Sequence, residues 1–437
     1  MTWQERLQQA SGDNATSLSG QRDLVATLKT QVEGIVSVDT LARLACSNPN
    51  LARSEVKSAC RRAFENAAWS DVSDERRKDC VSQLMDALFG MGILQDLVED
   101  ETITEIMVNG PDSVFIEREG VIVPSGRSFS DEAELRALID RILGPLGRRV
   151  DEASPMVNAR LEQGHRVNVV IPPIAMDGPA VTIRKFRTHV LTLEEMASSM
   201  GPGVGQFLTW AVRLRKSIAV SGGTGSGKTT VLNALSCKIA PGERIVTIED
   251  SAELRFHEHP HVVRLEARPR NAEGLGEVTI RDLVTNSLRM RPDRIVVGEV
   301  RGSEALDMLQ AMLTGHAGSM TTLHANTPAE SVSRLATMVR YGAQLPQDVI
   351  ERNIASAIDL VVQTKRTMEG ARLVTEVVTL AFDEALGRCV TETLYERRSP
   401  DYPGTWKDLP EWFDELIESG VASEGEVGTW RQSHLGQ

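Results

Sequence analysis

The sequence predicts an α/β protein with a parallel sheet at its centre, and three observations support that fold class. A glycine-rich loop at residues 222–229, with the sequence Gly-Gly-Thr-Gly-Ser-Gly-Lys-Thr, joins a strand-like run to a helix-like run. After this loop, apolar strand patterns alternate with helical patterns, which is typical of parallel sheets. Before it, short strands separated by turns follow a charged helical segment, so we expect smaller domains ahead of the parallel sheet.

Length and composition favour several domains. The chain has 437 residues, of which 41% are hydrophobic, so it exceeds one ordinary domain and can fill two or three cores. No run approaches the ~18 apolar residues of a membrane span, and the N-terminus lacks a signal-peptide core, so we expect a cytoplasmic protein. The expected segments are a helical N-terminal segment, an α+β domain, the parallel-sheet domain and a C-terminal extension, at residues 1–95, 96–195, 196–385 and 386–437.

The first two segments differ in their periodicity. Apolar residues recur at helical spacing at Leu84, Leu88, Met91 and Leu94, and this pattern predicts a small helical bundle. In the second segment, short apolar runs are bounded by turn residues and predict antiparallel strands around one helix. The expected strands lie at residues 105–108, 114–116, 121–123, 166–171 and 181–186, with the helix at 132–143.

The glycine-rich loop has the sequence and the context of a phosphate-binding loop. A buried-strand pattern at residues 217–220 precedes it, and apolar residues recur at helical spacing from Val231 to Ile239 after it. Glycines let backbone N–H groups close around phosphates, Lys228 can reach the β- and γ-phosphates, and the Thr229 hydroxyl can ligate Mg²⁺. An unrelated glycine loop is the alternative, and the flanking strand and helix argue against it. We therefore expect ATP and Mg²⁺ as cofactors, with the nucleotide held by Gly222, Gly223, Thr224, Gly225, Ser226, Gly227, Lys228, Thr229 and Thr230.

Two further strand patterns end in carboxylates. The run at residues 244–250 delivers Glu249 and Asp250, and the run at 294–299 ends in Gly298 and Glu299, followed by a helix that Ser303 is expected to cap. The carboxyl ends of parallel strands face the ligand crevice. A Walker B strand usually ends in Asp, so with glycine at position 298 we expect Glu299 to act on Mg²⁺ through water and to orient the attacking water. Solvated strand ends are the alternative.

The histidines and cysteines give no sign of a zinc site. His316 and His324 lie one strand apart, and a polar group at a strand end can sense the γ-phosphate. His257, His259 and His261 alternate along another run, but no acidic or cysteine residue stands at a ligand spacing, so we expect exposed histidines. The five cysteines include no Cys-x-x-Cys pair and are expected to be reduced structural thiols.

Four motifs in this order resemble those of the ATPases of type II and type IV secretion and of type IV pilus assembly. They are the Walker A loop, an Asp box with Glu249 and Asp250, an atypical Walker B strand with Glu299, and a His box with His316 and His324. The resemblance covers roughly residues 95–380. It is strongest to the tight-adherence (Flp) pilus branch, through residues 104–110, 147–156, 279–284 and 288–294.

This resemblance implies a homohexameric ring in which a RecA-like P-loop domain follows a PAS-like α+β domain. In the family, the preceding domain contributes arginines to the nucleotide site. Arg166 and Arg184 match those positions, and they are favoured over Arg160 and Arg187. A guanidinium placed by domain closure would neutralise charge on the γ-phosphate, and a surface or interface ion pair is the alternative role. The expected catalytic residues are Glu299, Glu249, His324, Arg166 and Arg184.

The resemblance also implies a motor that hydrolyses ATP to power pilus assembly or protein secretion. It would reach the inner membrane through polytopic platform proteins, because a net-acidic protein needs a protein partner there. A pilin or secreted protein would be served indirectly. The formal charge of −13, from 48 basic and 61 acidic residues, makes nucleic acid an unlikely partner over the whole surface.

Two other functional classes stay open. A conjugation-type motor that moves DNA or a protein–DNA complex could share the same core, and the arginine-rich stretch at residues 264–270 could contact phosphate, although it lacks the interleaved aromatics of a stacking groove. A regulatory nucleotide-binding protein without turnover would need defective catalytic positions. Lys228, Thr229 and Glu299 are all present.

Overall fold

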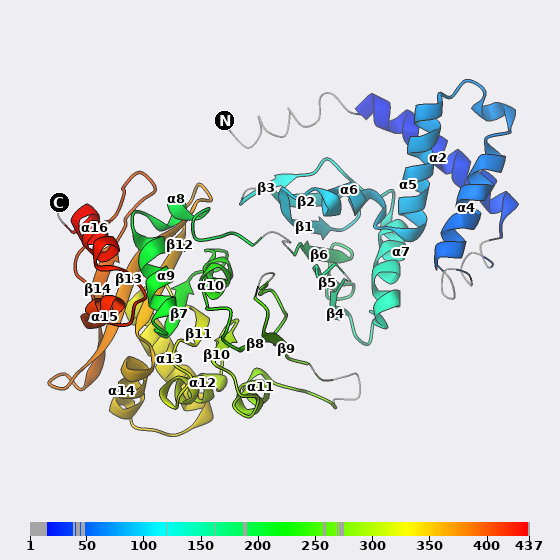
Figure 1. Cartoon of the computed structure of the whole chain (residues 1–437). Coiled ribbons are helices and arrows are strands. Elements are labelled where there is room, and N and C mark those ends of the chain that lie inside the picture. The colour runs from blue at the N-terminus through cyan, green and yellow to red at the C-terminus, as the bar shows by residue number, and fades with distance from the viewer. Residues whose placement is uncertain are drawn as a thin grey trace. The chain divides into compact units, whose positions relative to one another are not determined.

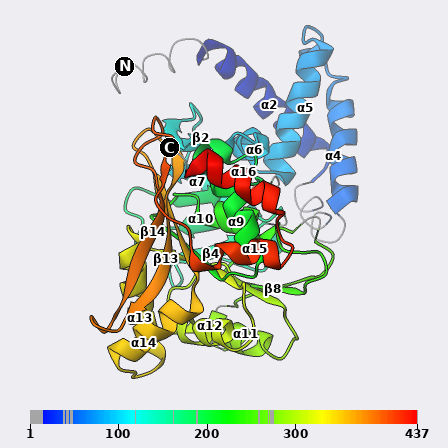
Figure 2. The same ribbon diagram turned by 60° about the vertical axis from the view of Figure 1, so that its left-hand side comes forward.

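The computed structural model describes residues 15–37, 40, 44, 49–118, 120–161, 163–186, 190–256, 259–268, 270 and 275–435. It divides into two compact units, Met1–Arg187 and Thr188–Gln437. Each unit has its own sheet (Figures 1 and 2). Each also has two apolar cores. The α/β fold class is therefore confirmed. Among the residues just given, no helix combines the length and the apolar character needed to cross a bilayer.

Among its described residues, the first unit starts with the helices α2 (Ala15–Ile35), α4 (Pro49–Ala63) and α5 (Asp74–Phe89). A short 3-10 turn, Ala67–Trp69, places Trp69 among them, and the indole N–H donates to Gln31 Oε1 at 2.8 Å. The three helices share one small core, so the expected helical bundle forms. Its largest buried side chains are Leu28, Val32, Val56, Trp69 and Leu84.

The rest of the first unit is an antiparallel sheet of six strands in the order β3-β2-β1-β6-β5-β4. Helix α7 (Glu132–Leu143) packs its apolar side chains into the same core as alternate residues of the strands, which leaves the other face of the sheet more polar. The strands are β1 (Ile103–Asn109), β2 (Ser113–Arg118), β3 (Val121–Pro124), β4 (Met156–Arg160), β5 (Arg166–Val170) and β6 (Ala180–Arg184), with α6 (Gln95–Glu99) ahead of them.

The second unit contains a nine-stranded sheet in the order β15-β14-β13-β12-β7-β11-β10-β8-β9. Neighbours from β12 to β9 run parallel, and the remaining pairs run antiparallel. The strands are β7 (Ile218–Gly222), β8 (Ile245–Glu249), β9 (Val262–Glu266), β10 (Arg294–Val297), β11 (Met320–His324), β12 (Leu360–Arg366), β13 (Arg372–Asp383), β14 (Arg388–Glu396) and β15 (Thr405–Trp406).

Helices cover both faces of this sheet, because its central strands are apolar on both sides. In β7, Ile218 and Val220 belong to one core and Ala219 belongs to the other. The first core includes α8 (Ala197–Met200), α9 (Val204–Arg213), α10 (Lys228–Ser236), α15 (Glu415–Glu418) and α16 (Glu424–His434). The second includes α11 (Ile280–Ser287), α12 (Glu304–Leu313), α13 (Pro328–Gly342) and α14 (Gln347–Ala357).

The C-terminal segment is continuous with the nucleotide-domain sheet. The boundary expected at residue 385 falls in the turn between β13 and β14, and these strands pair over most of their length. From β15 onward, the chain folds back over α9, where Trp406, Trp412, Phe413 and Trp430 pack around Phe207. This aromatic cluster is a long-range contact that periodicity cannot reveal, so the sequence predicted a separate extension where the structure has a continuing sheet and core.

Some local expectations differ from the structure. The helix after the phosphate-binding loop ends at Ser236, before Ile239. Ser303 stands at the start of α12, but its side chain makes no capping hydrogen bond. His259 and His261 precede β9, so they do not alternate along a strand, and His257 lies outside the described residues. Within the described part of the chain, no group of three or more metal-ligating side chains comes together.

Candidate active site

Four neighbouring parallel strands bring the predicted residues to one edge of the nine-stranded sheet. Strands β7, β11, β10 and β8 lie side by side in that order, and each neighbouring pair runs parallel (Figure 1). Carboxyl ends of parallel strands share an edge. There β7 ends at Gly222, β8 at Glu249 and β11 at His324, while Glu299 follows the end of β10 by two residues.

The loop after β7 is shaped to wrap around a phosphate group. Gly225 and Gly227 have φ angles of +68° and +96°, a left-handed conformation that residues with a Cβ rarely adopt. At Gly222, a Cβ would stand 2.3 Å from Thr364 Oγ1 and 2.5 Å from Ser226 Oγ. Helix α10 starts directly after Gly227, so its first N–H groups and the positive end of its dipole face the loop.

Lys228 holds its ammonium inside this loop. The side chain is buried, and Nζ donates to the Gly223 carbonyl at 2.8 Å and lies 3.3 Å from His324 Nδ1. Burial, followed by the positive charge of Lys228, lowers the pKa of His324. Thr229 and Thr230 lie half-buried on the first turn of α10.

Glu299 presents one engaged and one unengaged oxygen. Its Oε2 accepts from Arg301 at 2.7 Å. Its Oε1 lies 3.0 Å from His324 Nε2 without hydrogen-bonding alignment, so this buried oxygen has no hydrogen-bond donor among the described residues. An unsatisfied carboxylate oxygen beside a phosphate-binding loop is placed to accept a proton from, or to orient, a water molecule.

Glu249 is buried more deeply, with 3% of its surface exposed. Its Oε1 accepts from the backbone N–H groups of Glu253 at 2.7 Å and Leu254 at 3.0 Å, whereas Oε2 has no partner within the described part of the chain. Burial raises the pKa of Glu249 to about 7. The glycine at position 298 now has a physical reason, because a Cβ there would stand 2.8 Å from Glu249 Cγ.

Three of the four candidate arginines of the first unit form a row across its sheet. Arg160, Arg166 and Arg184 are paired directly across β4, β5 and β6, and Glu105 of β1 continues the row beyond Arg184. They therefore share one face of the six-stranded sheet. Arg187 lies outside the described residues.

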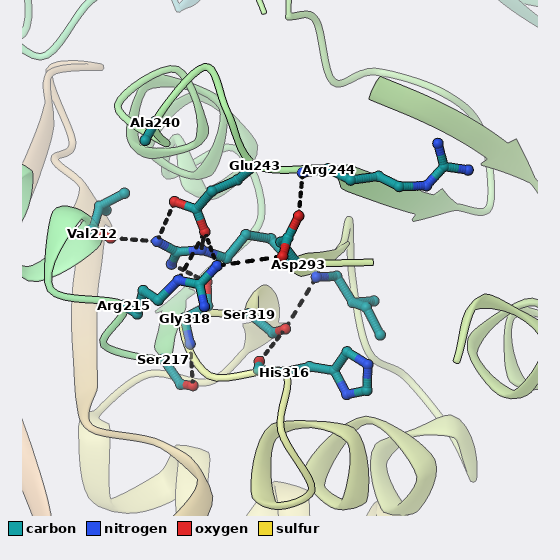
Figure 3. Close-up of polar contacts among 12 residues, drawn as sticks. Val212, Arg215, Ser217, Ala240, Glu243, Arg244, Asp293, His316, Gly318 and Ser319 are labelled. Atoms are coloured by element: carbon teal, nitrogen blue, oxygen red, sulfur yellow. Dashed lines mark hydrogen bonds and ion pairs between the residues drawn. The ribbon is translucent and has the colours of Figure 1, made fainter. Parts of the chain in front are cut away.

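The opposite edge of the nine-stranded sheet carries a second polar cluster (Figure 3). Arg294, the first residue of β10, is fully buried, and its Nε pairs with Glu243 Oε2 at 2.7 Å. Its two NH groups donate to the carbonyls of Gly318 at 2.9 Å and Val212 at 2.8 Å. The guanidinium thus ties together segments that precede three strands.

His316 belongs to this opposite edge. Its carbonyl accepts from Ser319 Oγ at 2.7 Å, and its ring Nδ1 lies 3.2 Å from the Ala311 carbonyl (Figure 3). The whole of β11 separates it from His324. The two histidines grouped in one motif are therefore not brought together within this chain, and only His324 contacts the loop lysine.

Three residues near the loop were not predicted from the sequence. Thr364 of β12 hydrogen bonds with Ser226 Oγ at 2.8 Å, and Arg372 of β13 donates to the Gly225 carbonyl at 3.0 Å. Arg301 reaches back to Glu299 from the turn after β10. Thr364 and Arg372 lie more than a hundred residues from their partners, so sheet order alone brings them here. Only Arg301, two residues beyond a predicted carboxylate, could have been found by charge spacing.

Comparison with known proteins agrees with this geometry. A profile of the family described as "Type II/IV secretion system protein" matches residues 88–392. A putative conjugal transfer protein of Mycobacterium tuberculosis (strain H37Rv) is 38% identical over 334 residues, which span 75% of this chain and 94% of that protein. The conjugal transfer protein TrbB of Rhizobium radiobacter is 35% identical over 286 residues, which span 63% of this chain and 83% of that protein.

A solved structure shows the same fold. The ATPase DotB of Yersinia pseudotuberculosis matches with a TM-score of 0.52 and 16% identity, over 69% of this chain and 81% of that chain. The fold is thus an N-terminal domain followed by a RecA-like domain, and the loop and the family match make the protein an ATP hydrolase. The chain belongs to the type II/IV secretion system protein family.

Proposed function

We propose that this chain is the ATP-hydrolysing motor of a conjugal-transfer apparatus, which moves DNA or a protein–DNA complex. The supporting relatives are named for conjugal transfer, and one of them aligns with this chain over 94% of its own length. The tight-adherence pilus branch rests on short motif runs alone, so it becomes the second candidate. Because the net charge is −13, the motor is expected to act on partner proteins rather than to bind DNA along its surface.

The unengaged oxygen of Glu299 is the observation that carries hydrolysis. It lies at the sheet edge where Lys228 and the glycine-rich loop form a phosphate cradle. A water molecule that donates to Glu299 Oε1 would be oriented for attack and could pass its proton to the carboxylate. Lys228 would exchange its contacts with the Gly223 carbonyl and His324 for the phosphates, so that His324 senses whether nucleotide is bound.

The residues also fit a magnesium ion. A hydroxyl and a carboxylate are oxygen ligands of the kind that Mg²⁺ prefers, and Thr229 on the first turn of α10 would supply the hydroxyl, with Glu299 acting through water. When bound, Mg²⁺ neutralises charge on the phosphates. Glu249, with its own unpaired oxygen, is the second carboxylate available at this edge.

Assembly as a homohexamer would give the arginine row its role. Arg160, Arg166 and Arg184 lie directly opposite one another on adjacent strands, so their side chains share one face of the six-stranded sheet. A phosphate group brought against this face would meet guanidinium groups, which supports Arg166 and Arg184 as contacts to the γ-phosphate. Polytopic proteins of the inner membrane are the proposed docking partners, and they would hold the motor on the cytoplasmic face. A transferred or secreted protein would be served through them.

The test is a Lys228→Ala substitution in the chromosome of the native host, with Lys238→Ala as the matched control. Lys238 lies just beyond α10 and pairs with Glu194 at 2.7 Å, away from the loop. DNA transfer to a recipient should fall about 10³-fold in the first strain and stay normal in the second. Surface filaments scored by electron microscopy separate the two candidates. Normal transfer with lost filaments would favour pilus assembly, and normal transfer with normal filaments would overturn both.

A further inference from the structure

A guanidinium joins the two carboxylate-bearing strand ends of the site. Arg301 NH2 donates to Glu299 Oε2 at 2.7 Å, and NH1 stands 4.0 Å from Asp250 Oδ2. Glu299 follows β10 and Asp250 follows β8, which are neighbouring parallel strands. The side chain of Arg301 therefore spans the edge of the sheet between the Walker B strand and the Asp box.

The backbone beneath Arg301 is held in place. Glu304, the first residue of α12 and itself 8% exposed, accepts from the backbone N–H groups of Arg301 at 2.7 Å and Gly302 at 2.8 Å. A Cβ at Gly302 would stand 3.0 Å from Glu304 Oε2, so this turn fits closely. Glu304 thus holds the turn ahead of α12, and it fixes the origin of the Arg301 side chain.

Glu299 needs such an anchor. The terminal torsion of a glutamate is broad and nearly two-fold, so an isolated carboxylate exchanges its two oxygens freely. Of the two oxygens here, Oε2 is held by Arg301, and Oε1 is left beside His324 without a hydrogen-bond donor among the described residues. The contact therefore fixes the plane of the carboxylate and leaves its second oxygen facing the site.

We propose that Arg301 is a positioning residue, which fixes the Glu299 carboxylate so that Oε1 is offered to the attacking water. The inference rests on the proposed role of Glu299. Arg301 itself acts only through that carboxylate and through its weaker contact with Asp250.

The alternative is an exposed ion pair with no effect on catalysis. The Arg301 side chain is 60% exposed, and exposed ion pairs add little to stability. A substitution at this position should therefore leave the fold intact, which makes turnover the informative measurement.

The first experiment compares Arg301→Gln with Arg301→Lys in purified full-length protein. The Gln variant should lose about 10- to 100-fold in kcat with KM for ATP unchanged, because misplacing a reacting group costs turnover rather than binding. The Lys variant should recover part of the loss. Arg281→Gln is the matched control, since Arg281 pairs with Asp307 at 2.8 Å between α11 and α12 and lies outside the site. An unchanged kcat, or a change in KM alone, overturns the proposal.

A double-mutant cycle separates this proposal from the role of Glu299. In a Glu299→Gln background, Arg301→Gln should have no further effect, because the group it positions is gone. If the two substitutions multiply, Arg301 acts independently and the proposal fails while Glu299 keeps its role. If Glu299→Gln alone turns over ATP at the wild-type rate, the role of Glu299 fails and the proposal falls with it. Thermal unfolding midpoints of all variants verify that each is folded.

Discussion

The two edges of the nine-stranded sheet are built from the same strands, but their buried polar groups are hydrogen-bonded to different degrees. At the amino edge, Arg294 uses its hydrogen-bonding groups on Glu243 and two backbone carbonyls. At the carboxyl edge, four buried oxygens, on Ser221, Glu249, Glu299 and Gln363, have no hydrogen-bond partner among the described residues. Each such group costs about 1–3 kcal/mol when nothing supplies the missing bond. The comparison indicates that one edge holds the sheet together while the other is left open for a ligand.

The largest expected effect comes from a substitution at the carboxyl edge, which we call the open edge. Lys228→Ala removes the cation that faces the loop, so ATP turnover should fall about 10³-fold. The free energy of unfolding should change little, because the lost contacts with Gly223 and His324 are few. Phosphate release assays and denaturant unfolding on the same preparation measure both quantities. A variant that keeps near-normal turnover would show that the loop does not carry the chemistry.

A substitution at the amino edge should lower stability rather than ATP binding. Arg294→Met leaves Glu243 partly buried with only Arg215 as its cation, so the free energy of unfolding should fall by about 3 kcal/mol. ATP affinity of the folded fraction should stay near wild type. Arg215→Met is the control, because that side chain is 46% exposed and its loss should cost less than about 1 kcal/mol. Equal losses for both variants would argue against a special role for the buried guanidinium.

A third change sharpens the contrast within the open edge. Glu299→Gln keeps the shape of the side chain but removes its charge, so turnover should fall about 10²-fold while ATP still binds. Fluorescent-nucleotide titration and steady-state hydrolysis separate the two. If hydrolysis were unaffected, Glu249 would be the next carboxylate to examine.

The smallest expected effect concerns pH. The pKa of Glu249 is raised from 4.5 to about 7 by burial, so the folded protein binds this proton more tightly than the unfolded chain does. The corresponding stability is fully present below pH 4.5 and is lost as the pH rises through 7. Glu249→Gln cannot ionise, so relative to wild type it should gain about 2 kcal/mol of unfolding free energy between pH 5 and pH 8. A pH-independent difference between the two proteins would contradict this environment for Glu249.

The sequence predicted those parts of the site that depend on local order. A strand, a glycine-rich loop and a helix in succession define the cradle, and parallel strands carry Glu249, Glu299 and His324 to one edge. The glycine at position 298 looked like a departure from a motif until its packing against Glu249 was seen. Contacts between distant segments gave no such signal. Thr364 reaches Ser226 from 138 residues away, and β14 joins the sheet beyond the expected boundary.

His316 shows a different limit of the sequence. Its spacing from His324 matches a motif, yet His324 is the last residue of β11 and His316 precedes that strand, so the two histidines lie at opposite edges of the sheet. The number of residues between two side chains therefore does not tell whether they lie at the same edge of a sheet. The candidate arginines of the first unit show the opposite behaviour. No motif groups Arg160, Arg166 and Arg184, yet strand pairing aligns them in one row.

The aromatic cluster over α9 has an optical consequence. Three of the six tryptophans of the chain lie in it, and Trp210 of α9 packs against Phe413 and Trp430. The indole N–H groups of Trp406 and Trp430 donate to the carbonyls of Pro202 and Gly203, just ahead of α9. Indole emission depends on hydrogen bonding and on the polarity around the ring. The intrinsic fluorescence of the protein is therefore concentrated where the chain enters its second unit, and it reports on that segment without an added label.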